Sequence, residues 1–303
     1  MESTGSGDGP LVPIERRELA RDKAKQSREQ RRKQQRRNRT VFRSLIAVVL
    51  VAAVAGVAFM LTSSAKPAPS GPRNMLSDGI KIGEGLQAVP TRPLAAEQQP
   101  VPSEPIADDV IDIRVYVDYL CTHCAEFDEE NNEQIAAWIQ EGAASLEVHP
   151  LALLDSQSQG HQYSTRAANA AACVANYAPD SFFSFNSALL AAQPDGGQGS
   201  LDDEEILDVA KQVGAGGTPI ADCIANQKFK SWVKAATVRA LNGPIPNASI
   251  ESVRVTPTIL INGAKYNYAY PFDSKDLAQV MTQAIGSVYN KMSTQEPTPA
   301  PEQ

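Results

Sequence analysis

The chain has 303 residues, of which 42% are hydrophobic, and this composition permits one substantial globular domain. Its net charge of −7 hides an uneven distribution, because residues 1–43 carry 13 Lys or Arg against 6 Asp or Glu, and the remainder carries 15 against 29. The two parts therefore have net charges of +7 and −14. Whole-chain averages exclude little here, and each segment has to be interpreted separately.

Residues 44–62 form an uncharged, apolar run of about the length that crosses a membrane as a helix. Lys and Arg crowd its N-terminal flank, which places the basic tail 1–43 in the cytoplasm and the rest of the chain outside it. A cleaved signal peptide is the alternative, since small residues follow at Ser63 to Ala65, but the long polar lead favours an uncleaved anchor. We therefore predict a single-pass protein of the cell membrane. A lipid contact explains the basic tail better than nucleic-acid binding does.

Residues 63–105 are rich in Pro, Ser, Ala and Gly, which is typical of a semi-rigid linker. Within this linker, Gly79 to Gly83 has a weak strand pattern that is compatible with an edge strand of the domain that follows.

Residues 106–290 carry the patterns of a folded domain, and the polar tail 291–303 is expected to be disordered. A β-branched strand at 110–119 leads into a cysteine motif and a helical pattern that runs to residue 139. The further predicted elements, in chain order, are a strand at 146–151, four or five helices within 160–242, a strand at 258–261, its hairpin partner at 264–268 and a helix at 274–289. This order predicts an α/β thioredoxin fold with a large α-helical insertion, preceded by one transmembrane helix.

The motif Cys121-Thr122-His123-Cys124 follows a strand and opens a helix, the context in which such a pair carries redox chemistry. The first thiol then lies at the helix N-terminus, where free N–H groups and the helix dipole stabilise a thiolate. We therefore expect the pKa of Cys121 to be lowered. A protonated His123 would add positive charge near the thiolate and lower that pKa further. Cys121 is the predicted nucleophile and Cys124 the more buried resolving thiol.

A permanent disulfide and half of a zinc site are the alternatives for this pair. Zinc requires two more ligands at suitable spacing, and the remaining candidates form no second motif of that kind. Those candidates are Cys173, Cys223, His149 and His161. No metal and no cofactor are expected.

A proline opens the strand predicted at 258–261, where a trans proline would remove a ladder bond. A cis Thr256-Pro257 bond beside the cysteines would explain it and leave the Thr256 backbone free to pair with an extended client peptide. An ordinary proline at the strand entry is the alternative.

The strand before Cys121-Thr122-His123-Cys124, the helical insertion and Thr256-Pro257-Thr258 together resemble the DsbA family, particularly its membrane-anchored actinobacterial members. The resemblance covers about residues 106–289. It implies a thioredoxin fold, a cis proline facing the cysteines, and disulfide formation in secreted proteins.

The chain departs from this family at two positions. Thr122 stands where family members commonly carry Pro, in the dipeptide that tunes the reduction potential. Val115 lies six positions before Cys121, where many thioredoxin-like enzymes keep a buried carboxylate. Asp118 or Glu126 would then be the candidates to relay protons, and a surface or strand-end position is the simpler interpretation of each.

Cys173 and Cys223 lie in the helical block and are predicted to form a structural disulfide in an oxidising compartment. Two buried free thiols, or an electron relay to Cys121, are the alternatives.

The predicted activity is an extracytoplasmic thiol-disulfide oxidoreductase that introduces disulfides into secreted or cell-envelope proteins. Its expected partners are reduced secreted clients and a membrane-embedded protein that reoxidises it. A reductase or isomerase of the same fold remains an alternative, because the direction of electron flow depends on reduction potential and partners. A membrane-tethered peptide-binding or chaperone module without redox turnover is another.

Overall fold

The computed structural model describes residues 70–94, 98–193 and 200–294. The chain divides into two compact units, residues 1–66 and 67–303, and all described residues belong to the second. The predicted transmembrane helix 44–62, the basic tail and residues 295–303 of the tail therefore lie outside the described residues. Over the part of the chain that is described, no helix combines the length and the hydrophobicity needed to cross a membrane.

A six-stranded sheet with the order β2-β1-β4-β3-β5-β6 forms the centre of the domain. Its two middle strands, β3 (Ile111–Val117) and β4 (Ala144–Pro150), are parallel and are joined by α2 (Thr122–Gln140). All other pairs are antiparallel. The remaining strands are β1 (Ile80–Gly83), β2 (Gln87–Ala88), β5 (Thr258–Ile261) and β6 (Ala264–Lys265).

The linker predicted at 63–105 proves to be part of the folded domain over much of its length. β1 pairs with β4, and Ile80 and Ile82 are fully buried there, as is Met75 just before them. Two apolar side chains in a strand of four residues are too few to stand out among prolines and glycines. The domain therefore begins well before the boundary that the composition indicates.

The alternation of side chains along the central strands divides the core between the two faces of the sheet. Ile113, Val115 and Val117 pack with side chains of α2 and of the C-terminal helix α8 (Ser274–Thr294). On the opposite face, Tyr116 and Leu260 pack with Ala240 of α7 (Lys230–Asn242). The sheet is thus covered on both faces, and α2 packs on it over β4.

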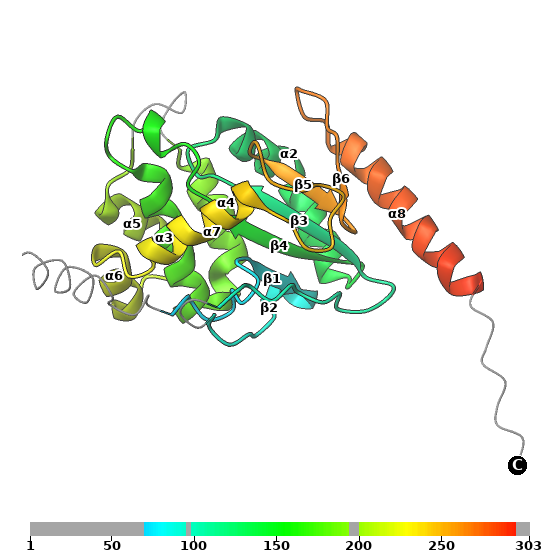
Figure 1. The fold of residues 1–303 in the computed structure, drawn as a ribbon, viewed down its shortest axis with the longest axis horizontal. Helices are drawn as coiled ribbons and strands as arrows, with labels where there is room; N and C mark the ends of the chain where they lie inside the picture. Colours follow the sequence, from blue (N-terminus) through cyan, green and yellow to red (C-terminus); the bar gives the residue numbers. More distant parts are fainter. Residues whose placement is uncertain (1–69, 95–97, 194–199, 295–303) are drawn as a thin grey trace, which may run out of the picture. The chain divides into compact units, whose positions relative to one another are not determined.

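The predicted helical block at 160–242 contains five described helices. They gather toward one end of the sheet, and α8 lies at the other end (Figure 1). A disulfide between Cys173 and Cys223 ties α3 to α6 across 50 residues. An Asp202–Glu205 capping box starts α5. The elements besides α7 are α3 (Tyr163–Tyr177), α4 (Phe182–Ala191), α5 (Asp203–Gln212) and α6 (Thr218–Ala225), with short 3-10 turns at Glu84–Leu86, Asp155–Gln157 and Pro179–Ser181.

Candidate active site

The CxxC motif lies at the junction between the end of β3 and the start of α2. β3 ends at Val117, a short turn follows, and Cys121 is the N-cap residue of α2. Both thiols are free, and Cys121 and Cys124 are only 5% and 1% exposed. Because Cys124 lies one turn further along α2, it is covered by the sheet while Cys121 stays at the helix end.

The environment of Cys121 stabilises its thiolate. Hydrogen bonds from Cys124 contribute most to this effect, the Thr256 side chain adds to it, and together they outweigh burial and lower the pKa of Cys121 to about 7. A substantial fraction of Cys121 is therefore ionised at neutral pH. The thiolate is the nucleophile in disulfide exchange and also the better leaving group.

The environment of Cys124 has the opposite effect. Burial raises the pKa of Cys124 well above its ordinary value, and donation to Cys121 adds to the shift. Cys124 thus holds its proton when the pair is reduced. The two thiols divide into an acidic one at the helix end and a protonated one beneath it.

The Thr256-Pro257 peptide bond is cis, and its loop lies directly against Cys121. The Cys121 Sγ–H donates to the Thr256 carbonyl at 3.1 Å. The first ladder pair of β5 joins Thr258 to Tyr116, so Thr256 lies just outside the paired sheet. The structure therefore brings this predicted element, distant in sequence, to the cysteine pair.

His123 does not have the role near the Cys121 thiolate that the sequence predicted. Its side chain is exposed, and its Nδ1 is 2.8 Å from Oε2 of Glu126, whose other oxygen accepts from the Tyr270 hydroxyl at 2.9 Å. The hydrogen bond with His123 is the main cause that lowers the pKa of Glu126. His123 is thus paired with a carboxylate, and the lowered pKa of Cys121 comes from Cys124 and Thr256 instead. Thr122, the other residue of the dipeptide, is exposed in the first turn of α2.

This difference leads to a prediction about the pKa of Cys121. Thr256→Val removes the side-chain hydroxyl that helps to lower the pKa of Cys121 and is expected to raise that pKa by about one unit. His123→Ala, the comparison variant, is expected to move the pKa of Cys121 by less than about 0.3 unit, because the exposed His123 side chain is paired with Glu126 and not with Cys121. The ultraviolet absorbance of the thiolate, followed against pH, measures both. A larger shift for His123→Ala than for Thr256→Val would contradict the assignment.

Asp118 is a buried strand-end carboxylate, not a surface one. It is fully buried, and its carboxylate accepts backbone N–H groups from Leu120, Leu153 and Leu154 at 2.7 to 2.9 Å. Burial raises the pKa of Asp118, although these hydrogen bonds oppose the rise. Its contacts join the turn before Cys121 to the segment after β4, so Asp118 holds that turn in place.

Sequence reasoning missed an aromatic segment that closes the other side of the site. The Tyr268 hydroxyl donates to the Pro257 carbonyl at 3.0 Å, and Tyr268 packs on Phe272, which packs on Phe127 of α2. Tyr270 rests edge-on against His123. The alternating Tyr266-x-Tyr268-x-Tyr270 pattern was the available signal. The segment links the cis-proline loop to the active-site helix.

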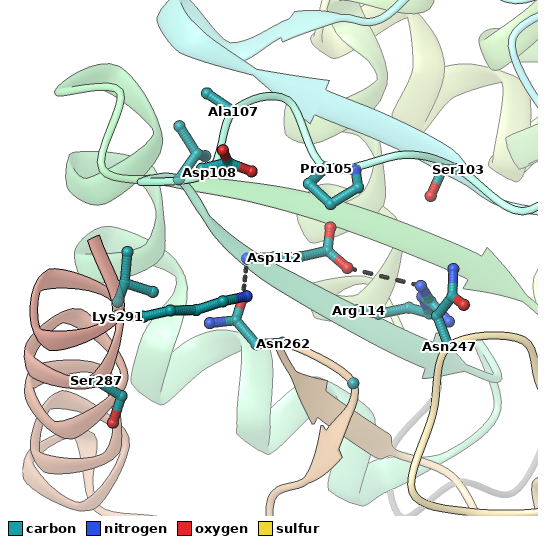
Figure 2. Close-up of a pocket in the computed structure, with 13 residues that line it drawn as sticks. Ser103, Pro105, Ala107, Asp108, Asp112, Arg114, Asn247, Asn262, Ser287 and Lys291 are labelled. Atoms are coloured by element: carbon teal, nitrogen blue, oxygen red, sulfur yellow. Dashed lines mark hydrogen bonds and ion pairs between the residues drawn. The ribbon is translucent and has the colours of Figure 1, made fainter. Parts of the chain in front are cut away.

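A separate hollow of about 380 Å³ lies at the opposite end of β3, as Figure 2 shows. Here the Asp112 carboxylate forms ion pairs with Arg114, at 3.6 Å, and with Lys81, at 2.9 Å. Its backbone N–H donates to Oδ1 of Asn262. These charges already pair with one another, so we assign this hollow no catalytic role. Among the described residues, no group of three or more His, Cys, Asp or Glu side chains is arranged to hold a metal.

Cys121, with its lowered pKa, and the buried, protonated Cys124 form an arrangement that can exchange disulfides. The chain is an enzyme of the thiol-disulfide oxidoreductase class. A thioredoxin family model matches residues 99–280, more than half of the chain. The chain belongs to the thioredoxin family. No curated protein matches its sequence.

Solved structures with the same fold include thiol-disulfide enzymes. Oxidised Mycobacterium tuberculosis DsbA is 25% identical with a TM-score of 0.50, the match covering 72% of this chain and 100% of that one. Mycobacterium tuberculosis DsbG, a disulfide bond oxidoreductase, is 23% identical with a TM-score of 0.52, covering 77% and 97%. Bacillus subtilis BdbD is 18% identical with a TM-score of 0.51, covering 73% and 100%. These likenesses agree with the predicted DsbA-like thioredoxin fold with its helical insertion.

Proposed function

We propose that the protein is an extracytoplasmic oxidase that introduces disulfides into secreted or cell-envelope proteins through Cys121 and Cys124. The observation that carries this proposal is the pair of thiols at the start of α2, with the pKa of Cys121 lowered and that of Cys124 raised, in a fold that resembles DsbA. Stabilising the thiolate stabilises the reduced enzyme, which makes the disulfide form a stronger oxidant. The likeness to DsbA supports the same direction.

The proposed reaction proceeds in two exchanges. A client thiolate attacks Sγ of Cys121 in the enzyme disulfide, which forms a mixed disulfide and releases Cys124 as a thiolate that takes up a proton. A second client thiolate then attacks the client sulfur of the mixed disulfide and releases the Cys121 thiolate. The client gains a disulfide and the enzyme is left as a dithiol. The low pKa of Cys121 favours this last departure.

The Thr256 loop is the proposed contact for the client backbone. Thr256 lies before the paired part of β5 and next to Cys121, so an extended client segment can add to the sheet there. Val255, which precedes it, is 56% exposed and offers an apolar contact to the same segment.

The location and partners belong to the same proposal. The charge pattern around residues 44–62 supports a membrane anchor with a cytoplasmic tail and the domain outside. Reduced secreted proteins would be the clients, and a membrane-embedded oxidant would regenerate the Cys121–Cys124 disulfide. Without such a partner, one disulfide per enzyme molecule is the limit of the reaction.

The test uses the full chain in detergent micelles and a reduced, unfolded secreted protein as client. Cys121→Ala is expected to abolish oxidative refolding above background, and Cys124→Ala to accumulate client-linked mixed disulfides, seen as bands that a reductant removes. Refolding by Cys121→Ala at the wild-type rate would instead support a chaperone without redox turnover.

The reduction potential separates an oxidase from a reductase or isomerase. A value near about −120 mV, as in DsbA, supports the oxidase, and one near about −270 mV, as in thioredoxin, supports the reductase. Thr122 makes this measurement necessary, because the dipeptide departs from the family pattern at that position.

A further inference from the structure

The cis-proline loop (residues 255–258) has two hydrogen bonds that come from side chains outside it. The Cys121 thiol donates to the Thr256 carbonyl at 3.1 Å, and the Tyr268 hydroxyl donates to the Pro257 carbonyl at 3.0 Å. The last residue of the loop is already the first paired residue of β5. Within the described part of the chain, Tyr268 is therefore the only side chain besides the nucleophile that fixes this loop from outside by a hydrogen bond.

Tyr268 is itself anchored on two sides. Its half-buried ring packs on Phe272 with ring centroids 4.8 Å apart, and Phe272 packs on Phe127 of α2 at 5.5 Å. Two residues earlier, the Tyr266 backbone N–H donates to the Ile259 carbonyl of β5 at 2.9 Å. Burial raises the pKa of Tyr268, so its hydroxyl keeps its proton and stays a donor at neutral pH. The hydroxyl is thus held between the sheet and the active-site helix.

The proposed task of the loop gives this hydrogen bond a consequence. An extended client segment that adds to a sheet pairs through its main chain, so the protein groups that it meets must point in the right directions. A loop that is fixed before the client arrives loses less conformational entropy on binding. A small thiol such as dithiothreitol has no peptide main chain and gains nothing from the loop. A residue that positions the loop should therefore affect peptide thiols and spare small ones.

We propose that Tyr268 is a positioning residue for client recognition, which holds the cis-proline loop in the conformation that pairs with the client main chain. The inference rests on the proposed client contact at Thr256. It concerns the step in which a client thiolate attacks Sγ of Cys121 and breaks the bond to Cys124. Tyr268 exchanges neither electrons nor protons in that step. It favours peptide thiols over small thiols by ordering their binding site in advance.

The neighbouring tyrosines of the same segment have other partners. The exposed Tyr270 donates its hydroxyl to Glu126 on α2, at 2.9 Å. Tyr266 is buried, and its hydroxyl has no hydrogen bond with the loop among the described residues. Tyr266→Phe is therefore a matched control for Tyr268→Phe, because each change removes one hydroxyl from the same segment and keeps the ring.

The experiment uses the full chain in detergent micelles with the Cys121–Cys124 disulfide formed. Its reductants are dithiothreitol, a short unstructured peptide with two cysteines, and the same peptide N-methylated at the residues that flank each cysteine. N-methylation removes main-chain donors that an added strand uses. Alkylation of the new enzyme thiols at successive times gives the rates, which are divided by the concentration of attacking thiolate.

The wild type is expected to react faster with the unmethylated peptide than with the methylated one. Tyr268→Phe is expected to slow the reaction with the unmethylated peptide about fivefold, the effect of one lost hydrogen bond. Its rates with the methylated peptide and with dithiothreitol are expected to change by less than about twofold, because neither reaction uses the paired loop. Tyr266→Phe is expected to keep the wild-type rate with each reductant.

Two results would overturn the role of Tyr268 alone. Equal slowing with dithiothreitol would mean that Tyr268 acts on the reactivity of the disulfide, and an unchanged rate with the unmethylated peptide would mean that it does not position the loop. A wild type that reacts equally with both peptides would instead refute the client contact at Thr256, and the inference with it. The refolding test of Cys121→Ala is separate from these outcomes, since it tests the redox function itself.

Discussion

Replacing Cys173 and Cys223 together with alanine is expected to lower the free energy of unfolding by about 4 kcal/mol. Their disulfide closes a loop of 50 residues, and loss of that constraint lets the unfolded chain gain entropy. The sulfurs are also buried, at 0% and 2% exposure, so their removal leaves a small cavity between α3 and α6. A domain of this size should then melt about 10 °C lower. Urea unfolding followed by circular dichroism measures the change.

The matched comparison is the Cys121→Ala/Cys124→Ala variant, measured beside wild-type protein in which the Cys121–Cys124 disulfide is formed. That disulfide closes a loop of only a few residues, so its removal should cost considerably less stability. Equal losses for the two pairs would show that loop closure is not how the Cys173–Cys223 bridge acts. The same Cys173→Ala/Cys223→Ala protein tests whether this bridge relays electrons, since a structural bridge leaves the reduction potential of Cys121–Cys124 unchanged.

The order of elements could be predicted from the sequence because each signal was local. The β-branched run before Cys121, the helical period after it and the turn at Asn262-Gly263 depend on residues close together in the chain. The cis bond at Thr256-Pro257 was predictable for another reason, because proline at a buried strand start excludes ordinary pairing. β1 was recognised only weakly, since its register depends on pairing with β4 and not on its own four residues.

The side-chain partners around the cysteines were not predictable in the same way. The position of His123 in the motif indicated a positive charge near the thiolate, but its partner is Glu126, three residues away on the exposed side of α2.

Apart from loss of the Cys173–Cys223 disulfide, the replacement of buried Glu147 should destabilise the domain most. Its carboxylate, 1% exposed, accepts hydroxyl hydrogen bonds from Ser77 and Ser103 and lies 3.3 Å from Arg114. Burial alone would raise the pKa of Glu147, but His149 and Arg114 outweigh that effect and lower it. The carboxylate therefore ties the segment before β1 and the residues before β3 to the central strand β4.

Glu147→Ala is accordingly expected to lower the free energy of unfolding by about 3–5 kcal/mol at neutral pH, because the buried Arg114 loses its buried carboxylate and keeps only the longer ion pair with Asp112, at 3.6 Å. Glu147→Gln keeps the shape and one acceptor and should lose less. The exposed Glu133→Ala serves as a control and should change stability by under about 0.5 kcal/mol. Denaturant unfolding of the three variants beside the wild type gives these differences.

The pH dependence distinguishes lost charge pairing from lost packing. Because folding lowers the pKa of Glu147, the stability it contributes is fully present above the unfolded pKa, about 4.5, and is lost as pH falls toward the lower folded value. The gap between wild type and Glu147→Ala should therefore narrow as the pH falls below about 4.5. A gap that stays constant across that range would mean that Glu147 acts by packing alone.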